Sequence, residues 1–218
     1  MTDAQARRLW DAAARLTAPA RVVEIGSFQG RSTIVLASAA PAGVEVVAID
    51  PHAGNDRGPQ ELSGFADAAQ GDHEAFLANL SAAGVRDRVR HVREFSSAAL
   101  SEVDGEVDLL YIDGAHRYRP ALDDIRRWGD RVRDGGTLLI HDSFSSVGVT
   151  LAILSSLLRD RRFTYVGRSG SMTEYHRTPP SSPARNAGRQ LAQLPWFARN
   201  VVLKALILAK VRKGDWPY

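Results

Sequence analysis

Short apolar runs alternate with helix-like stretches along most of this chain, and that alternation restricts the fold more than any other feature. Runs such as V-D-L-L-Y-I and T-L-L-I are almost continuously apolar, as parallel strands are when helices cover both faces of their sheet. The pattern therefore predicts an α/β fold. The expected strands are Arg21–Ile25, Glu45–Asp50, Val89–Arg93, Val107–Ile112 and Thr137–His141.

Helical periodicity fills the intervals between these runs. The expected helices are residues 3–16, Ser32–Ala40, His73–Ala83, Ser96–Glu102, Tyr118–Arg131 and Val147–Asp160. Two later stretches, Phe163–Arg168 and Ser171–Arg177, flank a glycine and predict a hairpin with one strand antiparallel to the rest. The long connection at 51–72 is typical of a lid or binding loop.

The C-terminal part of the chain differs from the rest in composition. T-P-P-S-S-P at 178–183 predicts a linker, and we divide the chain into a domain at 1–182 and a basic, apolar helical extension at 183–218. The extension holds seven Lys or Arg and one Asp, which leaves 21 basic and 24 acidic residues elsewhere. The net charge of +3 therefore comes from the extension, and general nucleic-acid binding by the domain is not indicated.

The extension is expected to be helical over Leu194–Arg212, and three roles are open for it. Its basic and apolar residues fit an interfacial membrane helix, an oligomerisation helix or a helix packed on the domain. Leu203 and Ile207 fall among the basic residues on a helical wheel, which favours a packed or intersubunit helix. We expect a homo-oligomer, with peripheral contact to the inner membrane face as the alternative role.

Several protein classes are disfavoured by composition. The chain has no cysteine, so disulfides, thiolate catalysis and cysteine–zinc sites are excluded. The first residues lack the apolar core of a signal peptide, and no apolar run reaches the length of about 18 residues that spans a bilayer. A cytoplasmic location is the expectation.

Chemically capable residues gather where the predicted strands end. Four of the five strand ends carry an acid or a histidine within two residues: Glu24, Asp50, the Asp113–His116 segment and the His141-Asp142 pair. The carboxyl ends of parallel strands form one edge of a sheet, and ligands of open α/β sheets bind there. The sequence therefore predicts a single site at that edge.

The first of these ends carries the pattern E-x-G-x-x-x-G, with Gly26 and Gly30 after the strand. Gly26 permits a tight turn, and Gly30 lets a helix begin against a ligand. Glu24 stands where a dinucleotide fold places its first glycine, which disfavours a pyrophosphate. Asp50 ends the next strand, where an acid can accept the hydroxyls of a ribose. A nucleoside without a pyrophosphate, such as S-adenosylmethionine, fits both features.

Four motifs together resemble the class I S-adenosylmethionine-dependent methyltransferases: V-V-E-I-G-S-F-Q-G-R-S-T, V-V-A-I-D-P-H, L-L-Y-I-D-G-A-H and G-G-T-L-L-I-H-D. Within that class, the D-G-x-H and H-D pair resembles the metal-dependent macrolide-sugar, polysaccharide and catechol-type O-methyltransferases. The resemblance implies a Rossmann-like, doubly wound, mostly parallel sheet of seven strands with an antiparallel last strand. It covers roughly residues 20–177 and implies these cofactor-binding residues: Glu24, Gly26, Ser27, Gly30, Ser32, Asp50, Phe95, Ser96 and Asp113.

The resemblance also implies a metal site and a base. Asp113, His141 and Asp142 are the implied ligands of a divalent cation, Mg²⁺ or Mn²⁺, and His116 is the implied base. The relatives carry an acid where this chain has His141, and imidazole suits Mn²⁺ better than Mg²⁺. His141 therefore ligates a softer ion, leaves the ion to the two carboxylates, or acts as a second base.

These features predict an enzyme that methylates a hydroxyl of a sugar on a saccharide, glycolipid or glycosylated natural product. The lid segment 51–72 contains only one aromatic residue, Phe65, which disfavours the alternative of a small planar phenol. Two further classes stay open: a nucleoside-binding module without catalysis, which intact Asp113, His116 and Asp142 argue against, and a nicotinamide oxidoreductase, which Glu24 argues against.

Overall fold

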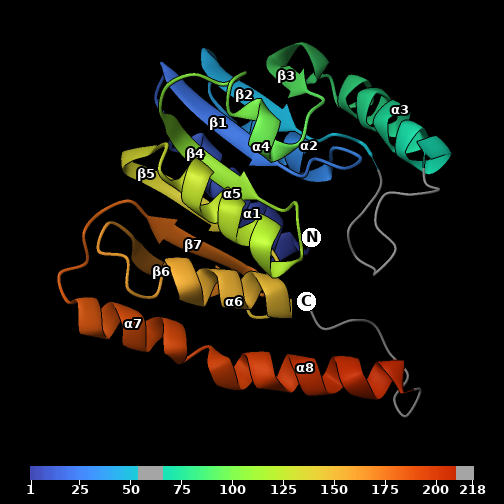
Figure 1. Cartoon of the computed structure of the whole chain (residues 1–218). Helices are drawn as coiled ribbons and strands as arrows, with labels where there is room; N and C mark the ends of the chain where they lie inside the picture. The colour runs from blue at the N-terminus through green and yellow to red at the C-terminus, as the bar shows by residue number, and fades with distance from the viewer. Residues whose placement is uncertain (54–65, 210–218) are drawn as a thin grey trace.

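The computed structural model describes residues 1–53 and 66–209 (Figure 1). Within that part of the chain, seven strands form one sheet in the order β3-β2-β1-β4-β5-β7-β6. The strands are β1 (Ala20–Ile25), β2 (Val44–Ile49), β3 (Val89–Val92), β4 (Val107–Ile112), β5 (Val132–Ile140), β6 (Thr164–Ser169) and β7 (Met172–His176). β1 to β5 pair in parallel, and β7 is antiparallel to both of its neighbours, so the predicted mostly parallel sheet and its terminal hairpin are confirmed.

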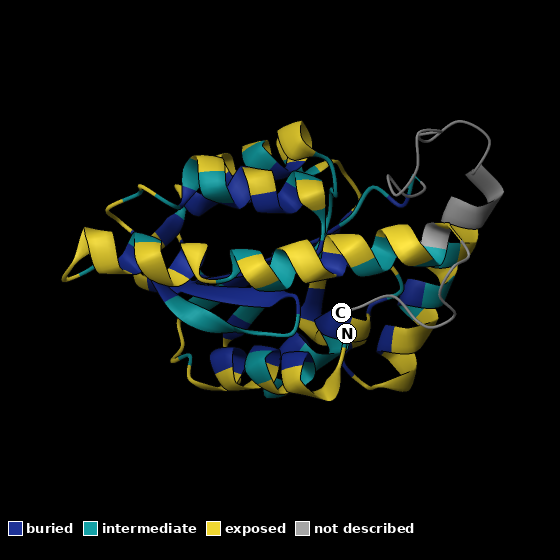
Figure 2. Cartoon of the chain, turned by 90° about the horizontal axis from the view of Figure 1, so that it is seen from below, coloured by how far each residue is buried: buried dark blue, intermediate teal, exposed yellow. Residues whose placement is uncertain are grey.

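Helices cover both faces of the sheet (Figure 1). The helices are α1 (Asp3–Ala14), α2 (Arg31–Ala39), α3 (Ala66–Ala82), α4 (Ser96–Ala99), α5 (Tyr118–Gly129), α6 (Val147–Ser156), α7 (Pro183–Leu191) and α8 (Leu194–Leu208), with a short 3-10 helix at Arg86–Arg88. Alternate residues of each strand enter two separate apolar clusters: Val22 packs with α1, α2 and α3, whereas Val23 packs with α4, α5 and α6. Figure 2 shows the resulting contrast between buried strands and helices with mixed burial. The doubly wound architecture is therefore confirmed.

The register of the parallel strands brings four strand ends to one level. Ile25 of β1 lies opposite Ile49 of β2 and Ile112 of β4, and Ile112 lies opposite Ile140 of β5. All four isoleucines are buried. The residues that follow them therefore begin their loops side by side at the carboxyl edge of the sheet.

Two elements begin several residues before their predicted starts. β5 begins at Val132 rather than at Thr137, with an irregularity in its pairing with β4 after Val107. The polar residues after Val132 interrupt the apolar run, which hid that part of the strand. α3 begins at Ala66 rather than at His73, so only the first part of the predicted 51–72 lid remains a prediction; residues 54–65, including Phe65, lie outside the described residues.

The sequence prediction missed α7, because the segment A-R-N-A-G-R-Q is polar and contains a glycine. Ser182 caps its first turn by accepting a hydrogen bond from the Arg185 backbone N–H. Asn186 is buried and bonds to the backbone at β6: its Oδ1 accepts from Tyr165 N at 2.8 Å, and its Nδ2 donates to Phe163 O at 3.0 Å. A polar side chain therefore fixes α7 to the sheet edge.

α8 packs on the domain near the carboxyl edge of the sheet. Leu194, Trp196 and Phe197 contact the apolar cluster that α5 and α6 share. Asn200 Nδ2 donates to Phe144 O at 3.2 Å, and Lys204 Nζ donates to Ser145 O at 2.9 Å, both in the loop after β5. A packed helix, one of the three predicted roles, accounts for these contacts.

Self-association and membrane contact stay predictions. The rest of the predicted helix, including Lys210, lies outside the described residues. None of the helices in residues 1–53 and 66–209 is both long enough and apolar enough to cross a bilayer.

Candidate active site

The loop after β1 is shaped by two glycines, each with a neighbour inside the protein. Gly26 has φ +86°, and a Cβ there would lie 2.5 Å from Asp113 O. Gly30 has φ +85°, and a Cβ would lie 3.1 Å from the ring of Phe76. Left-handed backbone favours glycine at both positions. Gly26 thus permits the loops after β1 and β4 to touch, and the close neighbour of Gly30 is Phe76.

Glu24 is fully buried beneath this loop. Its carboxylate accepts hydrogen bonds from the Ser32 hydroxyl and from Thr33 Oγ1, the latter at 2.5 Å. Burial raises the pKa of Glu24 to about 7, and the two hydrogen bonds act against that rise. Both oxygens of Glu24 are thus engaged by α2, so the carboxylate fixes the start of that helix beside the site. Sequence reasoning identified Ser32 but missed Thr33.

Ser27 and Asp50 lie at the neighbouring strand ends. Asp50 accepts hydrogen bonds from the backbone N–H groups of Phe28 and His52, each at 2.8 Å, and so ties the loop after β1 to the loop after β2. The hydroxyl of Ser27 is buried and has no hydrogen-bond partner among the residues that the structure describes. An unpaired buried hydroxyl is costly, and a bound polar ligand would satisfy it.

The loop after β3 presents an aromatic ring to solvent. Phe95 is 50% exposed, and Phe28 in the loop after β1 is 56% exposed. Ser96 Oγ donates to Asp124 Oδ1 at 2.5 Å, and Trp128 Nε1 donates to Ser96 O at 3.1 Å, so α5 anchors this loop. The sequence identified Phe95 and Ser96 but gave no signal for Phe28.

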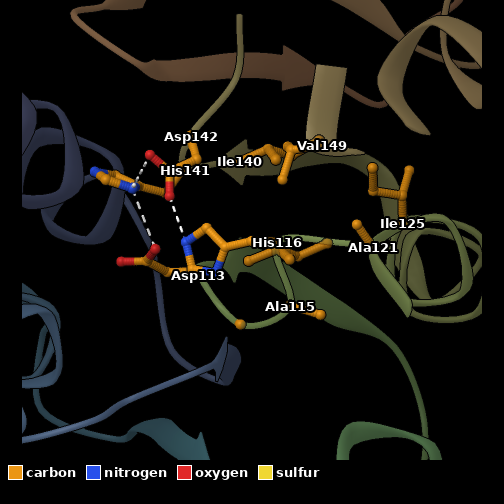
Figure 3. Close-up of a pocket in the computed structure, with 11 residues that line it drawn as sticks. Asp113, Ala115, His116, Ala121, Ile125, Ile140, His141, Asp142 and Val149 are labelled. Carbon is orange, nitrogen blue, oxygen red and sulfur yellow. Dashed lines mark ion pairs between the residues drawn. The ribbon is translucent and has the colours of Figure 1, made fainter. Parts of the chain in front are cut away.

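Asp113, His116, His141 and Asp142 converge from the loops after β4 and β5 (Figure 3). His116 Nε2 lies 2.5 Å from Asp142 Oδ2. His141 Nδ1 lies 3.1 Å from Asp113 Oδ1 and 3.6 Å from Asp142 Oδ1. The predicted catalytic and metal residues are therefore one cluster, with His141 between the two aspartates.

The charges in this cluster are strongly coupled. Burial alone would lower the pKa of His141, but Asp113 and Asp142 outweigh it and raise that pKa to about 10. Burial alone would raise the pKa of Asp142, but His116 and His141 hold it below its ordinary value. At neutral pH and without a metal, His141 is therefore protonated where it lies between Asp113 and Asp142.

The cluster also has the donor set of a divalent cation site. One ligand atom from each of Asp113, His141 and Asp142 lies within 4.8 Å of the other two. His141 Nδ1 lies near both carboxylates, whereas its buried Nε2 has no hydrogen-bond partner among the described residues. Two carboxylates and an imidazole are a donor set that divalent transition-metal ions accept. A cation there would compete with the proton on His141.

The surroundings of the cluster hold it in place. Tyr111 is buried on β4 and donates a hydrogen bond from its hydroxyl to Asp113 Oδ2 at 2.9 Å. Ser146 Oγ donates to His116 O at 3.1 Å, and Gly148 packs so closely on the same backbone that a Cβ would lie 2.3 Å from His116 O. Sequence reasoning missed all three residues. Tyr111 is marked in the sequence only as a hydroxyl within an apolar strand, and Gly148 only as a glycine within a helix. Ser146 has no such signal.

A small cavity lies behind these side chains and has a volume of about 10 Å³ (Figure 3). Its walls are mostly apolar, with Ala121, Ile125 and Val149 among them. That volume holds about one water molecule. A ligand larger than a water molecule must therefore approach the cluster from outside this cavity.

The similarity to known proteins covers the same region of the chain as the site. A family model described as a methyltransferase domain matches residues 23–143, which is more than half of the chain. The matched range begins in β1 and ends just after Asp142. It therefore includes each strand end described above.

Three solved structures share the fold. Cofactor-bound Rv0187 from MTB is 22% identical, covers 83% of this chain and 82% of its own, and has a TM-score of 0.62. The O-methyltransferase TomG from Streptomyces achromogenes, involved in tomaymycin synthesis and solved in complex with SAM, is 20% identical over 82% and 81%, with a TM-score of 0.60. The O-methyltransferase NovP is 16% identical over 80% of each chain, with a TM-score of 0.63.

Proposed function

Because the chain belongs to the methyltransferase domain family, we propose that it is an S-adenosylmethionine-dependent O-methyltransferase. One observation carries the proposal: a histidine, His116, is held against Asp142 at the carboxyl edge of the sheet, where the loops after β1, β2 and β4 also begin. A methyltransferase that acts on an alcohol needs such a base, because alcohols are almost fully protonated at neutral pH.

The cofactor would bind over the loops after β1, β2 and β3. The unpartnered Ser27 hydroxyl supplies a buried polar group for the methionyl part, and Asp50 supplies a carboxylate for the ribose hydroxyls. Phe95 supplies an exposed aromatic ring for the adenine. Glu24 acts indirectly, through Ser32 and Thr33, by fixing the helix that follows the loop.

His116 would take the proton of the acceptor hydroxyl. Asp142 is its partner at 2.5 Å and stabilises the imidazolium that forms. The backbone of His116 is fixed by Ser146 and Gly148, so the ring is positioned before substrate binds. His141 would start protonated, with its pKa raised to about 10, and would have to lose that proton before it could act as a base.

We assign the divalent cation to Asp113, His141 and Asp142. When bound, the ion would lower the pKa of the acceptor hydroxyl and orient its oxygen. An imidazole in the donor set favours Mn²⁺ over Mg²⁺. Tyr111 holds the Asp113 carboxylate through its hydroxyl and so limits the rotation of that ligand.

The acceptor class is proposed to be a sugar hydroxyl on a saccharide, glycolipid or glycosylated natural product. TomG, a structural neighbour, is an O-methyltransferase involved in tomaymycin synthesis, which supports a natural-product acceptor without bearing on a sugar. A small phenol is the second candidate, because two exposed aromatic rings, Phe28 and Phe95, lie in loops at this edge. A module without catalysis is disfavoured by the intact His116–Asp142 pair.

The test is methyl transfer from labelled S-adenosylmethionine to a panel of glycosides and phenols, with Mn²⁺, Mg²⁺ or EDTA. We expect label in at least one glycoside with Mn²⁺ and none in EDTA. Transfer that is equal in EDTA would remove the cation from the proposal. Failure of the protein to bind S-adenosylmethionine in calorimetry would overturn the function itself.

A further inference from the structure

Three histidines form a second cluster, away from the Asp113–Asp142 site. His52 follows β2, His73 lies on α3 and His91 lies on β3. Their ring centres are 5.0 Å apart for His52 and His73, 5.1 Å for His52 and His91, and 5.3 Å for His73 and His91. Phe76 packs against His52 and His91, with ring centres 5.4 and 4.7 Å away. The loop after β2, α3 and β3 thus contribute one imidazole each to a cluster in which every ring lies near the other two.

These separations match those of imidazoles that share a metal ion. A zinc–nitrogen bond is about 2.0–2.1 Å long, so two histidines on a tetrahedral ion have ring centres about 5 Å apart. Packing alone also brings rings this close. The spacing therefore permits a metal ion. The hydrogen-bond partners of the nitrogen atoms distinguish a metal site from rings that are only packed together.

Two of the histidines have buried nitrogen atoms without partners. Nε2 of His52 and Nε2 of His91 are both buried, and neither has a hydrogen-bond partner within residues 1–53 and 66–209. The His52 side chain is only 1% exposed. An imidazole that is packed for structure alone normally satisfies both nitrogens. These two Nε2 atoms therefore point to a ligand.

The opposite ring nitrogen of His91 is held in the way that metal-binding histidines usually are, and that of His52 faces a carboxylate at a longer distance. His52 Nδ1 lies 4.0 Å from Asp50 Oδ1. His91 forms a hydrogen bond with the backbone of Asp50, which leaves its Nε2 as the nitrogen without a partner. Metal-binding histidines commonly donate their second N–H to a carboxylate or a backbone carbonyl. Asp50 supplies the backbone group for His91, and its carboxylate lies near His52 without a hydrogen bond to the ring.

The charge state also suits metal binding. Burial is the main cause that lowers the pKa of all three histidines, and the pKa of His91 falls to about 4. Neutral imidazole is the form that binds a metal. Asp50 and Asp72 add negative charge near His52, whereas Arg93 adds positive charge near His52 and His73. The arginine is held by Gln70 through a 3.0 Å hydrogen bond.

We propose that His52, His73 and His91 bind a transition-metal ion of the zinc or cobalt type. Three imidazoles favour such ions over Mg²⁺. Among the described residues, ligand atoms that all lie within 4.8 Å of one another are found at Asp113, His141 and Asp142. The nitrogen atoms of the three histidines lie farther apart than that, so the histidine cluster must tighten to bind an ion. His73 is partly exposed on α3, so its side chain is the one of the three with room to rotate toward the other two. The bound ion would tie the loop after β2 to α3 and β3.

The test uses Co²⁺, because its visible absorption reports ligand number and geometry. The full chain is compared with a double variant, Asp113→Asn with Asp142→Asn, which removes the carboxylates of the other site. In that background, His73→Gln and His91→Gln each remove one proposed ligand. His176→Gln is the control, because His176 pairs with Glu174 on β7, outside both clusters.

We expect the double variant to bind one Co²⁺ with a tetrahedral spectrum and a raised melting temperature. His73→Gln and His91→Gln should each weaken that binding at least tenfold, and His176→Gln should not. His73→Gln alters a partly exposed side chain, so its circular dichroism should stay that of the parent. A double variant that binds no Co²⁺, or a His73→Gln variant that binds it equally well, would overturn the proposal.

Discussion

His116 Nε2 lies 2.5 Å from Asp142 Oδ2, and the two residues come from loops that follow adjacent strands, β4 and β5. Asp142 has φ +54°, so its carboxylate projects from a left-handed turn directly after the strand. The pair joins the proposed base to the proposed metal site. Substitution of Asp142 therefore tests both roles of the pair.

Asp142→Asn should lower the rate of methyl transfer by about 10²–10⁴-fold, because His116 loses the charge that stabilises its protonated form. Asparagine tolerates the left-handed backbone at this position, so the fold should persist. The measurement is release of S-adenosylhomocysteine with an acceptor that the native protein methylates. Asp134→Asn is the matched control on β5, with a side chain that is 98% exposed. Equal losses in the two variants would contradict the assignment.

Ser27→Ala should separate cofactor binding from stability. The hydroxyl is buried without a partner among the described residues, so its removal should leave the melting temperature unchanged or slightly higher. The same change removes a hydrogen bond to the cofactor, worth about 1 kcal/mol, and should raise the Kd for S-adenosylmethionine about fivefold. Calorimetry and thermal melts measure both effects. A lower melting temperature with an unchanged Kd would show that the hydroxyl serves only the fold.

Gly148→Ala should reduce turnover from a distance, because the added Cβ would lie 2.3 Å from His116 O and must displace that backbone. Overpacking of this kind costs about 1–3 kcal/mol of stability. Gly188→Ala is the control, since a Cβ there meets nothing within 4 Å, and it should be neutral or stabilising. Steady-state kinetics with thermal melts give the comparison. Native turnover in Gly148→Ala would mean that the backbone of His116 need not be fixed.

His141 should make the stability of the metal-free protein depend on pH. Its pKa is raised to about 10 in the folded state, above its ordinary value of 6.5, so the folded protein retains a proton that the unfolded chain loses between these values. The stabilisation from His141 is therefore complete below pH 6.5 and declines as the pH rises through about 10. Urea unfolding in EDTA, for the native protein and His141→Asn, measures the difference. A difference that stays constant across this range would contradict the proposed ion pairs.

The sequence predicted the fold well because the strands are buried on both faces. Val107–Ile112 was predicted without error, since a buried parallel strand is apolar almost throughout. The row of site residues at one sheet edge followed from the same pattern, and the register of Ile25, Ile49, Ile112 and Ile140 explains it. α7 was missed because Asn186 and Gln190, which bury its inner face, look like surface residues in a sequence.

Roles that depend on contacts between residues distant in the sequence could not be predicted from the sequence. Glu24 is a predicted cofactor-binding residue, and nothing in its sequence surroundings indicated that the hydroxyls of Ser32 and Thr33 also donate hydrogen bonds to it. Gly148 is 32 residues from His116 in sequence, and nothing local marks their contact. The three-histidine cluster likewise joins residues from a loop, a helix and a strand.

The most direct test of the proposed chemistry is anomalous X-ray diffraction from crystals grown with Mn²⁺ and S-adenosylhomocysteine. We expect one manganese peak within bonding distance of the Asp113 and Asp142 carboxylates, beside a cofactor that contacts Ser27. Absence of a peak there at full cofactor occupancy, or a peak that touches only one of the two aspartates, would contradict it.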